Sequence, residues 1–310
     1  MSAKTAKPRG GVIVPMITPL TDAGKLDEKS LSRVVDHLLA GGVDVIFVLG
    51  TTGEAASLSA DMRSRLVAGT VEHVGGRIPV YAGISGNCLA ESLAAAKEYL
   101  ARGAEALVAH LPTYFPLNDE EQYRYFKALL DGASGPLILY NIPQTTNMTI
   151  PLDVVERLSE HPNAAGLKDS SPDVARTAEL LMRMGKREKF PIFMGHTAFA
   201  AQGLAQGAAG YVPSTGNLAP TLCRHLYEAA RAGEVDRAAK HQAALNTVGR
   251  LYQGNRSVGQ SIAALKALMS EAKLCGPAVL PPLRTLDPAQ RKQLLEGLKA
   301  ENLTLTALAR

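Results

Sequence analysis

The sequence is poor in the residues that mark several other protein classes. It has 310 residues, no tryptophan, and three cysteines, Cys88, Cys223 and Cys275, which lie far apart and form no C-x-x-C pair. Zinc sites and disulfide frameworks need clustered or regularly spaced cysteines, so this pattern argues against both. Unclustered free cysteines are typical of a reducing cytosol. We therefore expect a cytoplasmic protein with no metal ion.

The chain also lacks long apolar runs and a strong excess of charge. No apolar run approaches the roughly 20 residues of a membrane helix, and the N-terminus has no apolar signal-peptide core. Basic residues outnumber acidic ones by only 33 to 29, with a local excess at Lys4, Lys7 and Arg9 that is typical of a solvated chain end. No basic segment is rich in aromatic residues. We expect neither a membrane nor a nucleic acid as partner.

What the sequence does have is a strict alternation of short apolar runs with longer amphipathic stretches. Helix-like patterns cover residues 28–40, 60–74, 89–101 and 120–130, for example. The eight strand-like runs are Val12–Ile17, Val45–Leu49, Pro79–Gly83, Ala106–Ala109, Leu137–Tyr140, Ala164–Lys168, Ile192–Gly195 and Gly210–Pro213. Such alternation predicts an α/β protein with a parallel sheet and crossover helices. Eight units favour a closed (β/α)8 TIM barrel over an open sheet.

The pattern changes after about residue 217. Residues 218–274 resemble helices only, with breaks near Gly233 and Gly254, and a last helix covers about 288–300. Three prolines between these regions, Pro277, Pro281 and Pro282, predict a rigid connector. We expect a catalytic barrel over residues 1–225 and a C-terminal helical appendage over residues 226–310.

A single lysine ends the sixth apolar run, in the sequence Ala165-Gly166-Leu167-Lys168. Burial favours the neutral form of an amine, and a neutral amine can attack a ketone to form a Schiff base. Catalytic residues of a β/α barrel lie at the C-terminal ends of its strands, where Lys168 falls. A lysine can also end a strand simply because the chain leaves the core there. The residues at the ends of the other predicted strands help to distinguish these two interpretations.

Two of those strand ends carry residues that could bind a carboxylate or move protons. In Gly50–Glu54, two glycines permit close approach of the backbone, and two threonines with adjacent N–H groups could cradle a carboxylate. An ordinary strand-to-helix turn would look similar, and no Gly-Lys-Ser/Thr follows as in a Walker loop. Tyr140 ends the fifth run; its hydroxyl would either bond to backbone in the core or relay protons during imine formation.

Three motifs together carry a family resemblance. Gly50–Glu54, Tyr140–Pro143 and Gly166–Asp169 resemble, in order and spacing, the dihydrodipicolinate synthase / N-acetylneuraminate lyase superfamily over nearly the whole chain. The resemblance implies a (β/α)8 barrel with a C-terminal helical region, assembled as a homotetramer that is a dimer of dimers. It also implies class I aldolase chemistry on pyruvate or another small 2-oxo acid, with no metal and no organic cofactor.

The same resemblance implies roles for individual residues. Lys168 would form the Schiff base and Tyr140 would shuttle protons, while Tyr114 would reach into the neighbouring subunit's site and complete a relay through Thr51. The residues implied to bind substrate are Gly50, Thr51, Thr52, Val212, through its backbone carbonyl, and Thr145, at the position that contacts the second substrate.

Position 145 departs from the family pattern. Synthase members have an arginine there that binds the carboxylate of the aldehyde substrate, and threonine cannot form such a bidentate clamp. Sialic acid lyases carry an acidic pair where this chain has Thr197 and Ala198. We therefore expect a lyase, either an aldolase or a dehydratase, that acts on a 2-keto-3-deoxy sugar acid. Hydroxyl-binding groups could come from Thr145, Thr146, Asn147, His110, His196 and Ser214.

Two alternatives stay open on the sequence alone. The first is a 4-hydroxy-tetrahydrodipicolinate synthase that condenses pyruvate with aspartate semialdehyde through another carboxylate anchor. The second is a non-catalytic ligand-binding barrel. Retention of Lys168, Tyr140 and the threonine pair argues against the second, since a binding scaffold has no need of them.

Overall fold

Eight parallel strands close into a barrel in the order of the sequence, each paired with the next and β1 paired with β8. The computed structural model describes residues 10–308, so the basic residues Lys4, Lys7 and Arg9 lie outside the described range. The strands are β1 (Gly11–Pro15), β2 (Val45–Val48), β3 (Val80–Gly83), β4 (Ala106–His110), β5 (Leu137–Asn141), β6 (Ala164–Asp169), β7 (Ile192–Met194) and β8 (Gly210–Tyr211). The expected (β/α)8 fold is confirmed, and every strand begins and ends within two residues of its predicted apolar run.

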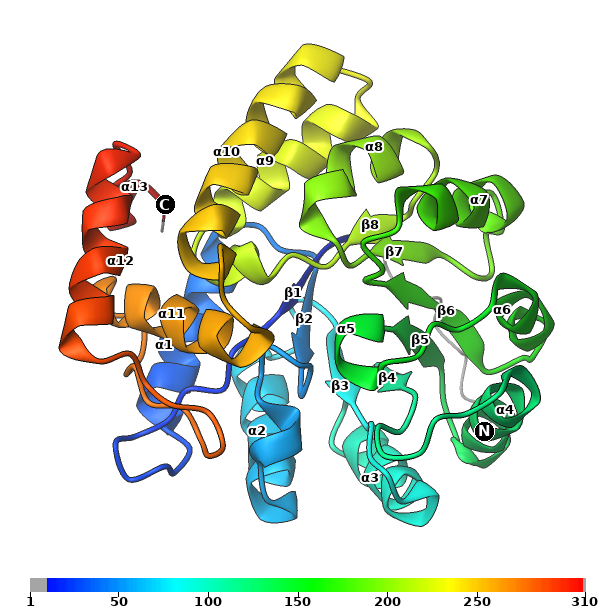
Figure 1. Ribbon diagram of the computed structural model, residues 1–310. Helices are drawn as coiled ribbons and strands as arrows, with labels where there is room; N and C mark the ends of the chain where they lie inside the picture. Colours follow the sequence, from blue (N-terminus) through cyan, green and yellow to red (C-terminus); the bar gives the residue numbers. More distant parts are fainter. Residues whose placement is uncertain (1–9, 309–310) are drawn as a thin grey trace.

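Helices cover the outside of the barrel, as Figure 1 shows. Several begin at a side chain that caps the first turn, such as Asp27, Ser59 and Asn118, each of which accepts a hydrogen bond from the backbone N–H of the third residue of its helix. The barrel helices are α1 (Glu28–Ala40), α2 (Ala60–Val74), α3 (Leu89–Ala101), α4 (Asp119–Gly132), α5 (Pro143–Thr146), α6 (Leu152–Ser159), α7 (Val174–Met184), α8 (Ala200–Ala205) and α9 (Pro220–Arg231). Short 3-10 turns are η1 (Ala55–Ser57), η2 (Thr197–Phe199) and η3 (Ser214–Asn217).

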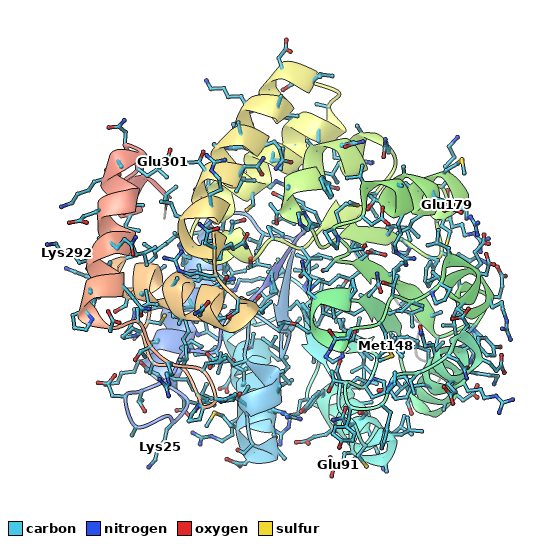
Figure 2. All side chains as sticks on the ribbon, viewed as in Figure 1. Lys25, Glu91, Met148, Glu179, Lys292 and Glu301 are labelled. Carbon is cyan, nitrogen blue, oxygen red and sulfur yellow. The ribbon has the colours of Figure 1, made fainter. Side chains whose placement is uncertain are left out.

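The apolar residues form two separate cores because strand side chains alternate between the two faces of the sheet. One cluster fills the inside of the barrel and includes Phe47, Phe193, Tyr140 and Val212. The larger cluster packs between the strands and the surrounding helices. In Figure 2 the labelled charged side chains, such as Lys25 and Lys292, lie at the periphery of the molecule. The barrel interior is therefore packed, and a ligand can enter only at its ends.

The C-terminal region is helical, as expected, and gathers on one side of the barrel in Figure 1. It consists of α10 (Val235–Gln253), α11 (Val258–Glu271), α12 (Pro288–Ala300) and α13 (Leu305–Leu308). The expected break at Gly233 falls between α9 and α10, and the one at Gly254 falls between α10 and α11. Residue 225 lies inside α9, which packs against α10, so the division at that residue stays a prediction.

Among residues 10–308, no helix has both the length and the apolar character that a membrane crossing requires.

Candidate active site

Lys168 and Tyr140 are brought together by the pairing of β5 with β6. Their Cα atoms are partners in the register of the two strands, so their side chains leave the sheet at the same level. The Lys168 amine lies 3.8 Å from the centroid of the Tyr140 ring and 5.1 Å from that of Phe47. Lys168 is only 6% exposed. The site therefore presents a buried amine directly against a phenol ring.

A polar network on the other face of β6 holds these strand ends in place. The Asp169 carboxylate accepts hydrogen bonds from the Asn141 amide, at 3.1 and 3.2 Å, and from the Ser171 N–H, at 2.8 Å. Arg176 on α7 forms a buried ion pair with the same carboxylate at 3.2 Å. The residue that follows Lys168 is thus tied to the residue that follows Tyr140. This coupling limits the freedom of the Lys168 and Tyr140 side chains.

The loop after β2 is shaped by packing against the protein itself. A Cβ atom on Gly50 would lie 2.8 Å from the Phe47 ring, and one on Gly53 would lie 2.9 Å from the Met16 carbonyl oxygen. Both glycines are therefore required by close approach to protein atoms. Thr51 and Thr52, between them, line the cavity described below.

Glu54 ends this loop and turns away from Lys168 into a buried ion pair. Its Oε1 atom lies 2.7 Å from Nζ of Lys266 on α11, and its Oε2 atom accepts a hydrogen bond from the Leu280 N–H at 2.8 Å. Lys266 also donates to the Thr18 carbonyl at 2.9 Å, and both charged side chains are 0% exposed. Burial lowers the pKa of Lys266, and the adjacent Glu54 carboxylate opposes that shift. This pair fastens the catalytic end of the barrel to the C-terminal helices.

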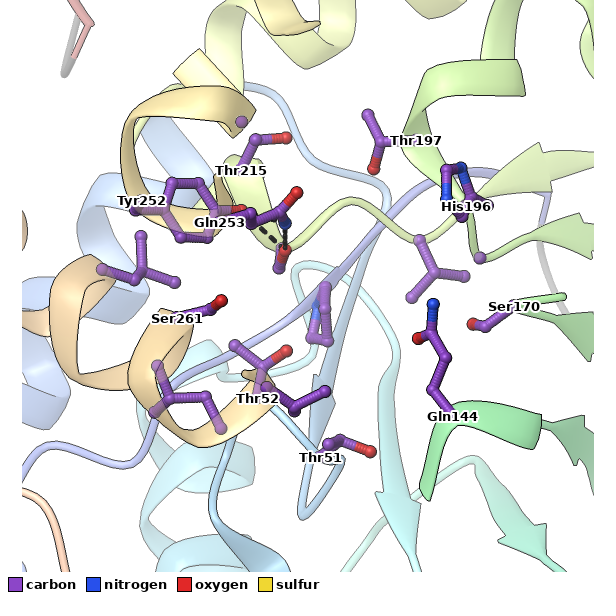
Figure 3. A pocket seen from close by; sticks show the side chains of 18 of the residues that line it. Thr51, Thr52, Gln144, Ser170, His196, Thr197, Thr215, Tyr252, Gln253 and Ser261 are labelled. Atoms are coloured by element: carbon purple, nitrogen blue, oxygen red, sulfur yellow. Dashed lines mark hydrogen bonds between the residues drawn. The ribbon is translucent and has the colours of Figure 1, made fainter. Parts of the chain in front are cut away.

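A cavity of about 870 Å³ opens at the C-terminal ends of the strands. Figure 3 shows its two sides: Gln144 on α5 and Ser170 and His196 in loops after the strands lie opposite Tyr252 and Ser261 from the C-terminal helices. Lys168 and Tyr140 also line it. The volume exceeds the needs of a three-carbon acid, so the cavity has room for a second substrate or a longer 2-oxo acid.

The structure brings most of the sequence-predicted site residues together, but not all of them. Lys168, Tyr140, Thr51, Thr52 and Val212 line the cavity, whereas Gly50, Thr145 and Tyr114 do not belong to its lining. Gly50 is buried beside Phe47. The Thr145 hydroxyl sits in the short helix α5, where it donates to the Ile142 carbonyl at 3.4 Å.

Tyr114 is the most exposed of these residues, at 79%. Its ring packs edge to face against Phe115, which is itself 69% exposed, with the ring centroids 5.0 Å apart. The loop that carries them is held at its base by Asn87, whose side chain accepts a hydrogen bond from the Thr113 N–H at 2.9 Å. The two rings therefore leave the chain's own cavity and face solvent.

Of the six groups expected to bind hydroxyls, His196 and Ser214 line the cavity. His196 stacks on Phe199 at a centroid distance of 4.8 Å, and burial lowers its pKa, which favours the neutral ring. His110 lies behind Tyr140 with its ring at 6.1 Å, and burial lowers its pKa as well. The other three, Thr145, Thr146 and Asn147, belong to α5 and its end and are absent from the lining.

Several cavity residues carried no recognisable signal in the sequence. Most come from α10, α11 and the turn between them, including Asn246, Arg250, Arg256 and Ser261. A hydrogen-bonded cluster of three side chains joins the two sides of the cavity. The Ser214 hydroxyl lies 2.7 Å from the hydroxyl of Tyr252, and the Gln253 amide donates to both hydroxyls, at 3.2 and 3.0 Å. These contacts link the rim of the barrel to the C-terminal helices.

A sequence model described as the dihydrodipicolinate synthetase family matches residues 8–301. The chain belongs to this family. The described residues 10–308 include no group of three or more His, Cys, Asp or Glu side chains placed to hold a metal ion. The family match gives this chain the family's fold and lyase class, in agreement with the sequence motifs.

Two relatives of this chain are named as synthases. The chain is 31% identical, over 94% of its length and 97% of the relative's, to a 4-hydroxy-tetrahydrodipicolinate synthase of Albidiferax ferrireducens. It is 36% identical to the Aromatoleum aromaticum protein of that name, over 72% of this chain and 76% of the relative. These names favour the synthase alternative over the 2-keto-3-deoxy sugar acid that the sequence led us to expect.

Solved structures of the family superpose closely. YagE, a prophage protein of the dihydrodipicolinic acid synthase family from E. coli K12 in complex with pyruvate, gives a TM-score of 0.89 at 28% identity, covering 95% of this chain and 99% of that one. Dihydrodipicolinate synthase from Bacteroides thetaiotaomicron gives 0.89 at 30% identity with the same coverage.

Proposed function

We propose that this chain forms an imine between Lys168 and the ketone of pyruvate, and makes or breaks a carbon–carbon bond next to it. The observation that carries the proposal is the buried Lys168 amine, 3.8 Å from the Tyr140 ring centroid in a cavity also lined by Thr51 and Thr52. The two threonines hold the pyruvate carboxylate. Borohydride reduction in the presence of pyruvate tests this directly, because it fixes the imine as a stable mass increase on one peptide.

In the proposed reaction, Lys168 carries the covalent intermediates and Tyr140 transfers protons. The Lys168 amine attacks the ketone carbon, and the resulting carbinolamine loses its oxygen as water to give the imine. Tyr140 moves the protons of these steps through its hydroxyl. Loss of a proton from the methyl carbon gives an enamine, which attacks the aldehyde carbon of a second substrate. Water then hydrolyses the imine and restores the lysine.

Replacement of Tyr140 by phenylalanine is expected to slow turnover by roughly 100-fold or more, the scale of a general acid–base contribution. The ring would stay in the barrel interior, where it packs with its neighbours, and only the hydroxyl would be lost. The measurement is the steady-state rate of pyruvate consumption, with circular dichroism as a check on folding. A variant with unchanged turnover would leave Tyr140 with a packing role alone.

Two second substrates are worth testing, each for a specific reason. The curated relatives carry the name 4-hydroxy-tetrahydrodipicolinate synthase, which makes aspartate semialdehyde the first candidate. Threonine in place of an arginine at position 145, together with the hydroxyl and amide groups of Gln144, Ser214 and Gln253 in the cavity, favours a hydroxylated aldehyde and therefore a 2-keto-3-deoxy sugar acid.

One comparison separates the two candidates. The rate of pyruvate consumption is measured with aspartate semialdehyde and with glyceraldehyde under identical conditions, and the two values of kcat/KM are compared. A ratio of about ten or more corresponds to at least 1.4 kcal/mol of discrimination and identifies the preferred substrate. Preference for aspartate semialdehyde supports the synthase. Preference for glyceraldehyde supports the sugar-acid lyase.

Activity is expected to depend on a second copy of the chain, because Tyr114 points away from its own cavity and is 79% exposed. In the proposed homotetramer, a dimer of dimers, each Tyr114 completes its partner's site, and a two-fold interface makes the exchange reciprocal. A Tyr114→Phe protein should be inactive alone and regain activity when mixed with Lys168→Ala subunits. Subunit exchange is verified by mass spectrometry; exchange without recovered activity would exclude this role.

A further inference from the structure

The cavity is lined by cations and by no acidic residue. Within residues 10–308, no aspartate or glutamate belongs to its lining, whereas Lys168, Arg250 and Arg256 all do. None of these three side chains forms an ion pair in the described part of the chain. A cavity with unpaired charge of one sign attracts and retains ligands of the opposite sign. Its occupants should therefore be anions.

The positive charges lie on separate parts of the fold. Lys168 ends β6 in the barrel, while Arg250 is in the last turn of α10 and Arg256 is in the turn between α10 and α11. In the proposed function, Lys168 and the threonines after β2 account for pyruvate. The two arginines on the C-terminal side of the cavity are left for another anionic group.

Arg256 has the geometry of an anion receptor. Its Nη1 atom donates to the Leu251 carbonyl at 2.9 Å and to the Gly254 carbonyl at 3.4 Å, which fixes the guanidinium against the end of α10. Neither Nε nor Nη2 of Arg256 has a hydrogen-bond partner among the described residues. Two free donors on a fixed planar group suit bidentate binding of a carboxylate or phosphate. Arg250, exposed and bonded to the Thr247 hydroxyl at 2.9 Å, adds charge nearby.

We propose that Arg256, assisted by Arg250, binds a terminal anionic group of the second substrate. The two arginines would thus take the place of the arginine that is absent at position 145, where this chain has a threonine. The inference rests on the proposed imine chemistry and narrows its substrate class. The second substrate is an aldehyde with a carboxylate or phosphate at its far end. The joined product is an acid with negative charge at both ends.

The test uses 2-oxo acids that mimic the joined product and needs no turnover. Borohydride trapping on the full-length enzyme is measured against concentration for 2-oxohexanoate, which has a neutral tail, and for 2-oxoglutarate, 2-oxoadipate and 2-oxopimelate, which end in a carboxylate. A second arm compares 2-keto-3-deoxygluconate with its 6-phosphate. At least one anionic tail should reach half-maximal trapping at about a tenfold lower concentration than its neutral counterpart, the value of one charge-assisted contact.

Variants then assign the preference to the arginines. Arg256→Gln should remove most of the ratio between anionic and neutral tails, and Arg250→Gln should reduce it. Arg284→Gln, which removes an equal charge from an exposed residue outside the cavity, should leave the ratio unchanged. The measured quantity is the ratio between the half-saturating concentrations of the neutral and the anionic acid for one variant. A smaller fraction of folded enzyme lowers the amount trapped with both acids and does not change this ratio.

The outcomes are distinguishable. Preference in the carboxylate arm or the phosphate arm supports the inference and names the anion. Equal trapping of anionic and neutral tails, or a preference that survives both arginine variants, overturns it while pyruvate trapping still supports the imine chemistry. A wild-type enzyme that traps no 2-oxo acid, pyruvate included, overturns the proposed function and this inference together.

Discussion

Replacement of Lys168 by alanine is expected to abolish borohydride-dependent attachment of pyruvate. The reason is that Lys168 is the amine that lines the cavity at the strand ends, 6% exposed and in contact with the Tyr140 ring. An imine cannot form without a primary amine at the ketone carbon, so no partial activity is anticipated. Intact-protein mass spectrometry after reduction measures the effect.

Lys189→Ala is the matched control. Lys189 is exposed and lies outside the cavity, so its loss should leave the trapped fraction at the wild-type level. Peptide mapping of the trapped wild-type enzyme should locate the mass increase on the segment that contains Lys168. Undiminished trapping in Lys168→Ala would mean that a different amine carries the chemistry.

Replacement of Lys266 by methionine should destabilise the fold by about 3–5 kcal/mol, the cost of leaving one charge of a buried pair alone. The Glu54 carboxylate, 0% exposed, would lose its partner at 2.7 Å and keep only the Leu280 N–H. Urea denaturation followed by circular dichroism measures the change in the free energy of unfolding. Glu54→Gln should be costly for the same reason, because it leaves the Lys266 ammonium buried and unpaired.

The double variant sharpens this prediction. If the two side chains interact as a pair, Glu54→Gln with Lys266→Met should cost less than the sum of the single variants, because neither charge is then stranded. Arg65→Met breaks the exposed pair with Glu28 and serves as control, with an expected cost of about 1 kcal/mol or less. Losses at Lys266 no larger than this control would show that the buried pair contributes little.

The barrel could be predicted from the sequence because each unit of it leaves a local pattern. Buried strands such as Val45–Val48 are continuous apolar runs, and helices such as α1 show one apolar face and a capping side chain. The short helix α5 left no such pattern. It is four residues long, too short for a periodicity, and it is defined by the Ile142 carbonyl and a proline at its start.

Only the barrel side of the candidate site could be predicted from the sequence. Lys168, Tyr140 and the threonines stand at strand ends, where topology alone brings them together. Arg256, Gln253 and Ser261 stand in and around a helix–helix turn whose position relative to the barrel depends on tertiary packing. Glu54 shows the limit most clearly. Its motif suggested an anion cradle, but its partner Lys266 is 212 residues away in the sequence, and no local pattern connects them.

That separation has a consequence for the synthesis of the protein. A ribosome adding about 5–20 residues per second needs roughly 10–40 s to travel from Glu54 to Lys266. Once Lys168 has been added, in the later part of this time, the nascent chain contains both Lys168 and Tyr140, but the loop of Thr51 and Thr52 still lacks the lysine that anchors its end. A chain that ends between residues 168 and 266 would thus contain Lys168 but leave the Glu54 carboxylate without its Lys266 partner. The ion pair that fastens the loop after β2 to the C-terminal helices can form only after α11 has been synthesised.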